Sequence, residues 1–191
     1  MNWVSLIFIS ISLAMDAFVV SVCDGLQYGN LKKWQKVTIA LTFGLFQGAM
    51  PIGGYFIGEL FIQYIADYDH WVAFGLLFLI GAFMIFEGVR DLVKKEVPIP
   101  KKFSIPMVLL QGVATSIDAL IVGITLTSLG INIFVDGAVI TGITFVISLI
   151  GVFLGKEINR LLRGKTSVAD IIAGLILIGL GISIILEHMV W

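Results

Sequence analysis

Long apolar runs alternate with short polar segments along the whole chain. Six of these runs reach the roughly 20 mainly apolar residues that a helix needs to cross a bilayer. They are Trp3 to Leu26, Val37 to Ile62, Trp71 to Asp91, Ser104 to Leu129, Ile133 to Gly155 and Val168 to Met189. The pattern predicts an all-α polytopic membrane protein with six transmembrane helices and almost no room for a separate soluble domain.

The composition supports this class of protein. Of the 191 residues, 59% are hydrophobic and 13% are charged, whereas roughly a quarter of the residues in a soluble domain carry a charge. The 12 Lys and Arg nearly balance the 13 Asp and Glu, so we expect the lipid bilayer and not nucleic acid as a partner. The single cysteine, Cys23, excludes an intramolecular disulfide and a thiolate metal cluster.

The basic residues predict the orientation in the membrane. All 12 fall in or beside the loops that follow the first, third and fifth apolar runs. Because Lys and Arg accumulate in cytoplasmic loops, these three loops are expected inside and both termini outside. The residues are Lys32, Lys33 and Lys36; Arg90, Lys94, Lys95, Lys101 and Lys102; and Lys156, Arg160, Arg163 and Lys165.

The two halves of the chain resemble each other. We take residues 1–92 and 104–191 as two three-helix repeats and residues 93–103 as a cytoplasmic connector. Three matches occur in order: Ala14-Met15-Asp16-Ala17 with Ser116-Ile117-Asp118-Ala119, Gly54-x3-Gly58-Glu59 with Gly151-x3-Gly155-Lys156-Glu157, and Gly81-x5-Glu87 with Gly181-x5-Glu187. Each repeat has an odd number of spans, so the second is inverted. Inverted repeats are typical of secondary transporters.

Asp16 and Asp118 are the strongest candidates for chemistry. Each lies about 20 Å from the start of its predicted helix, near the bilayer centre. A charge there costs roughly 2.5 to 3.5 kcal/mol on insertion scales. A protonated aspartate used only for helix packing is the alternative for one such residue, but two at equivalent positions favour a functional site.

Polar neighbours extend this candidate site. Helical spacing places Ser12 on the Asp16 face and Thr115 on the Asp118 face, although such hydroxyls often bond back to their own helix. In the second run, Pro51 removes a helix hydrogen bond and exposes the carbonyl of Gln47. We therefore predict a hinge at Pro51, with a packing kink as the alternative. The predicted ligand set is Asp16, Asp118, Gln47, Met50, Ser12, Thr115, Ser116 and Met15.

A divalent cation would neutralise both aspartates at once. An oxygen-rich site suits Mg, Ca or Mn, and a methionine sulfur from Met15 or Met50 shifts the preference toward Mn or Fe, although methionine is more often core filler. His70 and His188 lie at outer helix ends, so clustered imidazoles are not expected. Four glutamates near span ends are predicted to form cation-attracting vestibules or proton relays, with solvated end charges as the alternative: Glu59 and Glu187 outside, Glu87 and Glu157 inside.

The motifs resemble the MntP family of bacterial manganese efflux pumps, which belongs to the wider LysE-type exporter group. The resemblance covers the whole chain and rests on Met15-Asp16-Ala17-Phe18, Met50-Pro51-x2-Gly54 and Ala114-Thr115-Ser116-x-Asp118-Ala119. It implies export of Mn(II) across the bacterial cytoplasmic membrane, with Mn(II) as substrate and no prosthetic group. The family's essential aspartates fall on Asp16 and Asp118. Gln47 departs from the family pattern, in which some members carry a carboxylate.

Three other functions are compatible with parts of the pattern. A sporulation-associated relative shares the duplicated aspartate motif, and an amino-acid exporter would need a site for an ammonium and a carboxylate together. An intramembrane protease also uses paired aspartates, but its Gly-x-Gly-Asp motif is absent here. The chain is therefore predicted to be no enzyme. The Gly-x3-Gly runs can pack helices within one chain or between the chains of a homo-oligomer.

Overall fold

The computed structural model describes residues 3–28, 31–65, 69–94, 102–126, 132–161 and 166–190. Within these ranges every regular element is an α-helix and there are no strands, which confirms the predicted all-α class. The helices are α1 (Trp3–Tyr28), α2 (Lys33–Ile65), α3 (Asp69–Lys94), α4 (Ile105–Ala114), α5 (Ile117–Leu126), α6 (Ile133–Leu161) and α7 (Thr166–Val190).

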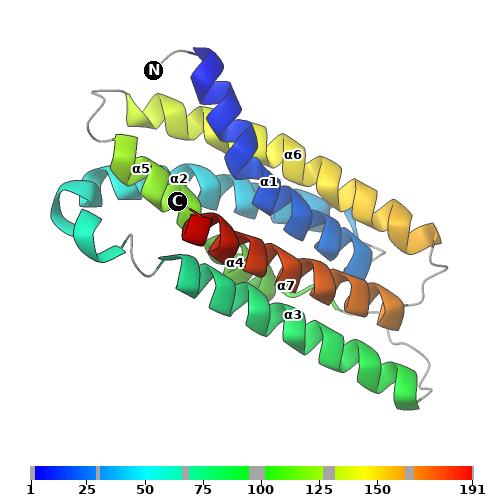
Figure 1. The fold of residues 1–191 in the computed structure, drawn as a ribbon. Coiled ribbons are helices and arrows are strands. Elements are labelled where there is room, and N and C mark those ends of the chain that lie inside the picture. Colours follow the sequence, from blue (N-terminus) through cyan, green and yellow to red (C-terminus); the bar gives the residue numbers. More distant parts are fainter. Residues whose placement is uncertain are drawn as a thin grey trace.

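Four stretches of the described residues are long and apolar enough to cross a membrane. They are Trp3–Tyr28, Lys33–Phe56, Ile105–Ile124 and Ile133–Leu161. The third of them includes both α4 and α5, which lie in line as one pass through the bundle (Figure 1). The protein is therefore an integral membrane protein.

The fourth apolar run is not the single continuous helix that the sequence pattern predicts. The helix is interrupted at Thr115 and Ser116, where the N–H of Ser116 donates to the carbonyl of Val113 at 3.1 Å. Regular hydrogen bonding resumes when the N–H of Leu120 donates to the carbonyl of Ser116 at 3.3 Å. The hydroxyl of Thr115 competes for the carbonyl of Gln111, and the hydroxyl of Ser116 donates to Gln47 outside this helix, which accounts for the break.

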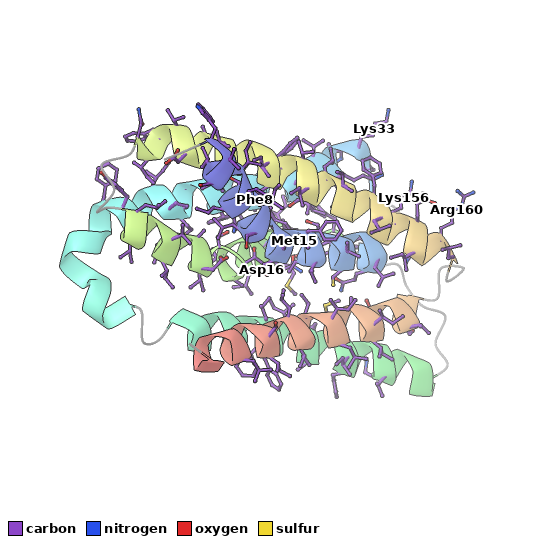
Figure 2. All side chains as sticks on the ribbon, turned by 45° about the horizontal axis from the view of Figure 1, so that its top comes forward. Phe8, Met15, Asp16, Lys33, Lys156 and Arg160 are labelled. Atoms are coloured by element: carbon purple, nitrogen blue, oxygen red, sulfur yellow. The ribbon has the colours of Figure 1, made fainter. Side chains whose placement is uncertain are left out.

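With α4 and α5 taken together, successive helices run in alternating directions, and two groups of helices form the bundle (Figure 1). In Figure 1, α1 and α6 run side by side, α2 lies against α6 and α5, and α3 pairs with α7. Figure 2 places the labelled Lys33, Lys156 and Arg160 at one end of the bundle. The chain enters α1 from the opposite end (Figure 1).

Glycines allow the helix pairs to approach closely. A Cβ added at Gly54 in α2 would overlap the carbonyl of Leu120 in α5, and one at Gly151 in α6 would lie 2.8 Å from the carbonyl of Phe18 in α1. Gly155 likewise packs against the carbonyl of Val22. These glycines therefore pack helices within one chain.

Candidate ion-binding site

Asp118 lies where the fourth pass is broken. It occupies the first turn of α5, immediately after the interruption at Thr115 and Ser116. The first N–H groups of a helix have no partner within that helix, and its last carbonyls are likewise free to bind other groups. A break inside an apolar pass therefore brings polar backbone and a carboxylate together in the membrane.

Gln47 joins three helices at this break. Its side chain is fully buried. Its Nε2 donates to the carbonyl of Leu13 in α1 at 2.8 Å, and its Oε1 accepts from the hydroxyl of Ser116 at 2.7 Å. The amide therefore ties the turn before Asp16 to the turn before Asp118.

The segments that carry the two aspartates also meet through apolar side chains. Leu13 of α1, Ala119 of α5 and Ile140 of α6 form one buried cluster, and the partly buried Met50 of α2 packs against it. Asp16 itself is partly buried and lies midway along the bundle (Figure 2). Asp118 is also partly buried. The structure thus brings the two segments that carry Asp16 and Asp118 to one small polar and apolar junction.

The other predicted ligands are distributed differently. The hydroxyl of Thr115 donates to the carbonyl of Gln111 at 3.0 Å, so it caps its own helix. Ser12 is exposed, and Met15 is 49% exposed on the outside of α1. Met50 contributes to the apolar cluster. Among the neutral residues of the predicted ligand set, Gln47 and Ser116 directly link the two aspartate segments in this conformation.

The predicted hinge and the glutamates have more varied surroundings. Pro51 lies inside α2, and its backbone packs against Gly123 of α5; its role as a hinge stays a prediction. Glu157 is exposed, and its Oε2 lies 3.8 Å from Nη1 of Arg160, as expected for a charge at a helix end. The side chains of Glu59, Glu87 and Glu187 lie outside the described residues.

Two buried hydroxyls on α6 were not predicted. Thr144 and Ser148 are fully buried, and neither hydroxyl has a hydrogen-bond partner among the described residues. Because α1 and α6 run parallel with Gly151 against Phe18, Ser148, three residues before Gly151, and Asp16, two residues before Phe18, lie at a similar height in the bundle. The predicted repeat contains a signal for Thr144. This residue precedes Gly151 by seven residues, as Gln47 precedes Gly54.

A second buried polar cluster was also missed. Asp24 of α1 and Asp170 of α7 are 0% and 1% exposed, and the Nε2 of Gln111 in α4 donates to Oδ1 of Asp24 at 3.0 Å. Both aspartates fall near the ends of apolar runs in the sequence. Such positions resemble ordinary solvated helix ends, so only the tertiary packing shows that they are buried.

The donor atoms on the two segments that carry Asp16 and Asp118 are of the kind that a hard cation binds. Two carboxylates supply two negative charges, and buried hydroxyls supply neutral oxygens, which are the ligands that Mg, Ca and Mn prefer. Among the residues that the structure describes, no group of three His, Cys, Asp or Glu side chains could hold a metal ion.

The fold and the junction define a polytopic helical membrane protein in which a carboxylate lies beside a break in one of its helices. Comparison with known proteins places it further. Residues 30–185 match the family model described as "Putative manganese efflux pump", and the chain belongs to this family, MntP.

Relatives from distant organisms match along their whole length. A protein of Wolinella succinogenes named "Putative manganese efflux pump MntP 1" is 41% identical over 186 residues, which cover 97% of this chain and 98% of the relative. A similarly named protein of Mannheimia succiniciproducens is 43% identical and covers 98% of each chain. One from Methanospirillum hungatei is 41% identical over 97% of this chain and 94% of its own. No solved structure matches the chain.

Proposed function

We propose that the protein is a secondary transporter that exports Mn(II) from the cytoplasm and binds the ion between Asp16 and Asp118. The observation that carries the proposal is the junction of the two aspartate segments through Gln47, which bonds the carbonyl of Leu13 and the hydroxyl of Ser116. The relatives named as manganese efflux pumps support the choice of ion and direction. A transported ion, and no chemical reaction, is the role we assign to the paired carboxylates.

The proposed coordination uses charge from α1 and α5 and neutral oxygens from α6. Asp16 and Asp118 neutralise the ion, and the free hydroxyls of Thr144 and Ser148 complete part of its shell. Mn(II) accepts such oxygen ligands readily. Gln47 and Ser116 fix the distance between the two aspartate segments, while the exposed Ser12 and Met15 are left out of the set.

Two inverted repeats are the proposed basis of alternating access. Gly54 packs on the carbonyl of Leu120 and Gly151 on that of Phe18. Leu120 follows Asp118 by two residues, and Phe18 follows Asp16 by two, so the two contacts are equivalent. Transporters of this architecture rock one repeat against the other around a midplane site. Protons entering from the outside would then displace the ion by neutralising the same carboxylates.

The test of this function is growth of a metal-sensitive cell in graded Mn, Fe, Co and Zn, with and without the protein. Export predicts protection against Mn together with a lower Mn content of the cell. Greater sensitivity with a higher Mn content would show uptake instead. Equal growth and equal metal content in all four series would contradict metal transport.

The proposed orientation places the termini outside. Lys33, Lys156 and Arg160 share one end of the bundle (Figure 2), which the positive-inside rule assigns to the cytoplasm. On a Cys23→Ala background, a membrane-impermeant thiol reagent added to intact cells is expected to label Asn132→Cys and to spare Lys33→Cys. Both positions are exposed, so burial cannot explain a difference. Labelling of position 33 alone would reverse the orientation.

A further inference from the structure

Asp24 and Gln111 form a polar pair that the proposed ion site does not use. Asp24 lies one turn before the end of α1 and is 0% exposed, and Gln111 of α4 is 1% exposed. The amide Nε2 donates to Oδ1 of Asp24 at 3.0 Å. The pair therefore connects α1, which carries Asp16, with α4, which precedes Asp118. The two helices belong to different predicted repeats.

Each member of the pair has an oxygen with nothing to bind. Asp24 Oδ2 and Gln111 Oε1 are buried and have no hydrogen-bond partner among the described residues. An unpaired buried acceptor costs roughly 1 to 3 kcal/mol. Both atoms are acceptors when Asp24 is ionised, so they cannot satisfy each other. A proton on Oδ2 removes the charge and turns this oxygen into a donor.

The described surroundings of Asp24 include no cationic partner. Within this part of the chain no Lys or Arg forms an ion pair with Asp24, so a proton is the group that would neutralise its charge. The titratable neighbours on α1 are Cys23, whose Sγ lies 3.7 Å from the carbonyl of Ala173, and Tyr28.

Three other helices bring charged groups to this region. From α7, Asp170 lies near Tyr28, as Asp24 does. From α6, the backbone of Lys156 lies against Gly25. Lys36 of α2 places its ammonium 4.2 Å from the ring centre of Phe153.

The position of Asp24 on α1 relates the pair to transport. Eight residues separate it from Asp16, which is about 12 Å along a helix. The intervening two turns lead toward the end of the bundle that holds Lys33, Lys156 and Arg160 (Figure 2). In the proposed orientation, Asp24 therefore lies between the ion site and the cytoplasm.

We propose that Asp24 and Gln111 form a proton-binding site on the cytoplasmic side of the ion site. Asp24 Oδ2 takes up one proton and shares it with the Gln111 oxygen, and release of that proton restores the carboxylate. Protons that have displaced Mn(II) from Asp16 and Asp118 would leave to the cytoplasm through this pair. The direction of proton flow rests on the proposed function. The existence of the proton-binding site does not depend on it.

Infrared spectroscopy of the purified protein tests the proton site without any metal. We expect an absorption band of a protonated carboxyl that disappears in Asp24→Asn and shifts in Gln111→Leu, because the leucine removes the acceptor. Asp136→Asn is the matched control, since Asp136 is also buried, at 7% exposure, but lies in the first turn of α6. A parent spectrum whose carboxyl bands are unchanged by Asp24→Asn and Gln111→Leu would overturn the proposal.

Proteoliposomes test the link to transport. An imposed pH gradient is expected to accelerate Mn(II) flux in the parent and in Asp136→Asn, and the acceleration should fall at least tenfold in Asp24→Asn. The Mn(II) affinity of Asp24→Asn should stay within twofold of the parent. If the parent moves Mn(II) and Asp24→Asn responds to the gradient as the parent does, the relay fails while the exporter stands. If the parent moves no Mn(II), the proposed function fails, and the infrared result alone decides the proton site.

Discussion

Asp16→Asn and Asp118→Asn are each expected to abolish manganese resistance and to leave the protein inserted and folded. Asparagine keeps the shape of aspartate and removes the charge that neutralises a divalent ion. Loss of an outer-sphere partner at a metal site typically costs 10- to 100-fold in affinity, so loss of a charged ligand should cost more than about 100-fold. The measurements are growth in graded Mn and Mn(II) binding to the purified variants.

The control for both variants is an aspartate elsewhere in the same bundle. Asp136 is buried in the first turn of α6 and is not part of the proposed site, so Asp136→Asn should keep resistance and binding. Near-parental Mn(II) binding by Asp16→Asn and Asp118→Asn would place the ion elsewhere. Loss of binding in all three variants would point to a general structural effect and would contradict a local site.

Gly54→Ala is expected to destabilise the bundle, whereas Gly53→Ala should not. A Cβ at Gly54 would overlap the carbonyl of Leu120 on α5, and a Cβ at Gly53 has nothing within 4 Å. Overpacking costs about 1 to 3 kcal/mol, while Ala at an open helical position gains up to about 1 kcal/mol over Gly. In thermal unfolding in detergent, the Tm of Gly54→Ala should therefore be lower than that of the parent. The Tm of Gly53→Ala should be equal to that of the parent or higher.

The same pair of variants links packing to function. Leu120 lies two residues after Asp118, so a displaced α5 would carry the aspartate away from its partner. Manganese efflux should fall in Gly54→Ala and stay at the parental level in Gly53→Ala. Equal melting temperatures for the two adjacent variants would show that α2 and α5 do not pack closely in the membrane.

Much of the candidate site was accessible from local sequence. Asp16 and Asp118 are conspicuous because each is a lone carboxylate inside an apolar run, and Pro51 and Gln47 because proline removes a hydrogen-bond donor at a defined distance. Met15 was predicted for its sulfur atom next to Asp16, but a position in the sequence does not show which side of the helix faces the neighbouring helices. The structure leaves Met15 49% exposed.

The sequence by itself determined the helical class and the number of apolar runs, because the length and hydrophobicity of a run are properties of contiguous residues. It also singled out Asp16 and Asp118 as candidates. Only the tertiary structure decided that the helix breaks at Thr115 and Ser116 and that Gln47 bridges α1 to this break. Asp24 illustrates the reason: its burial depends on α4 and on Gln111, which lies 87 residues away in the chain. Contacts over such separations form only when helices pack, and no local pattern contains them.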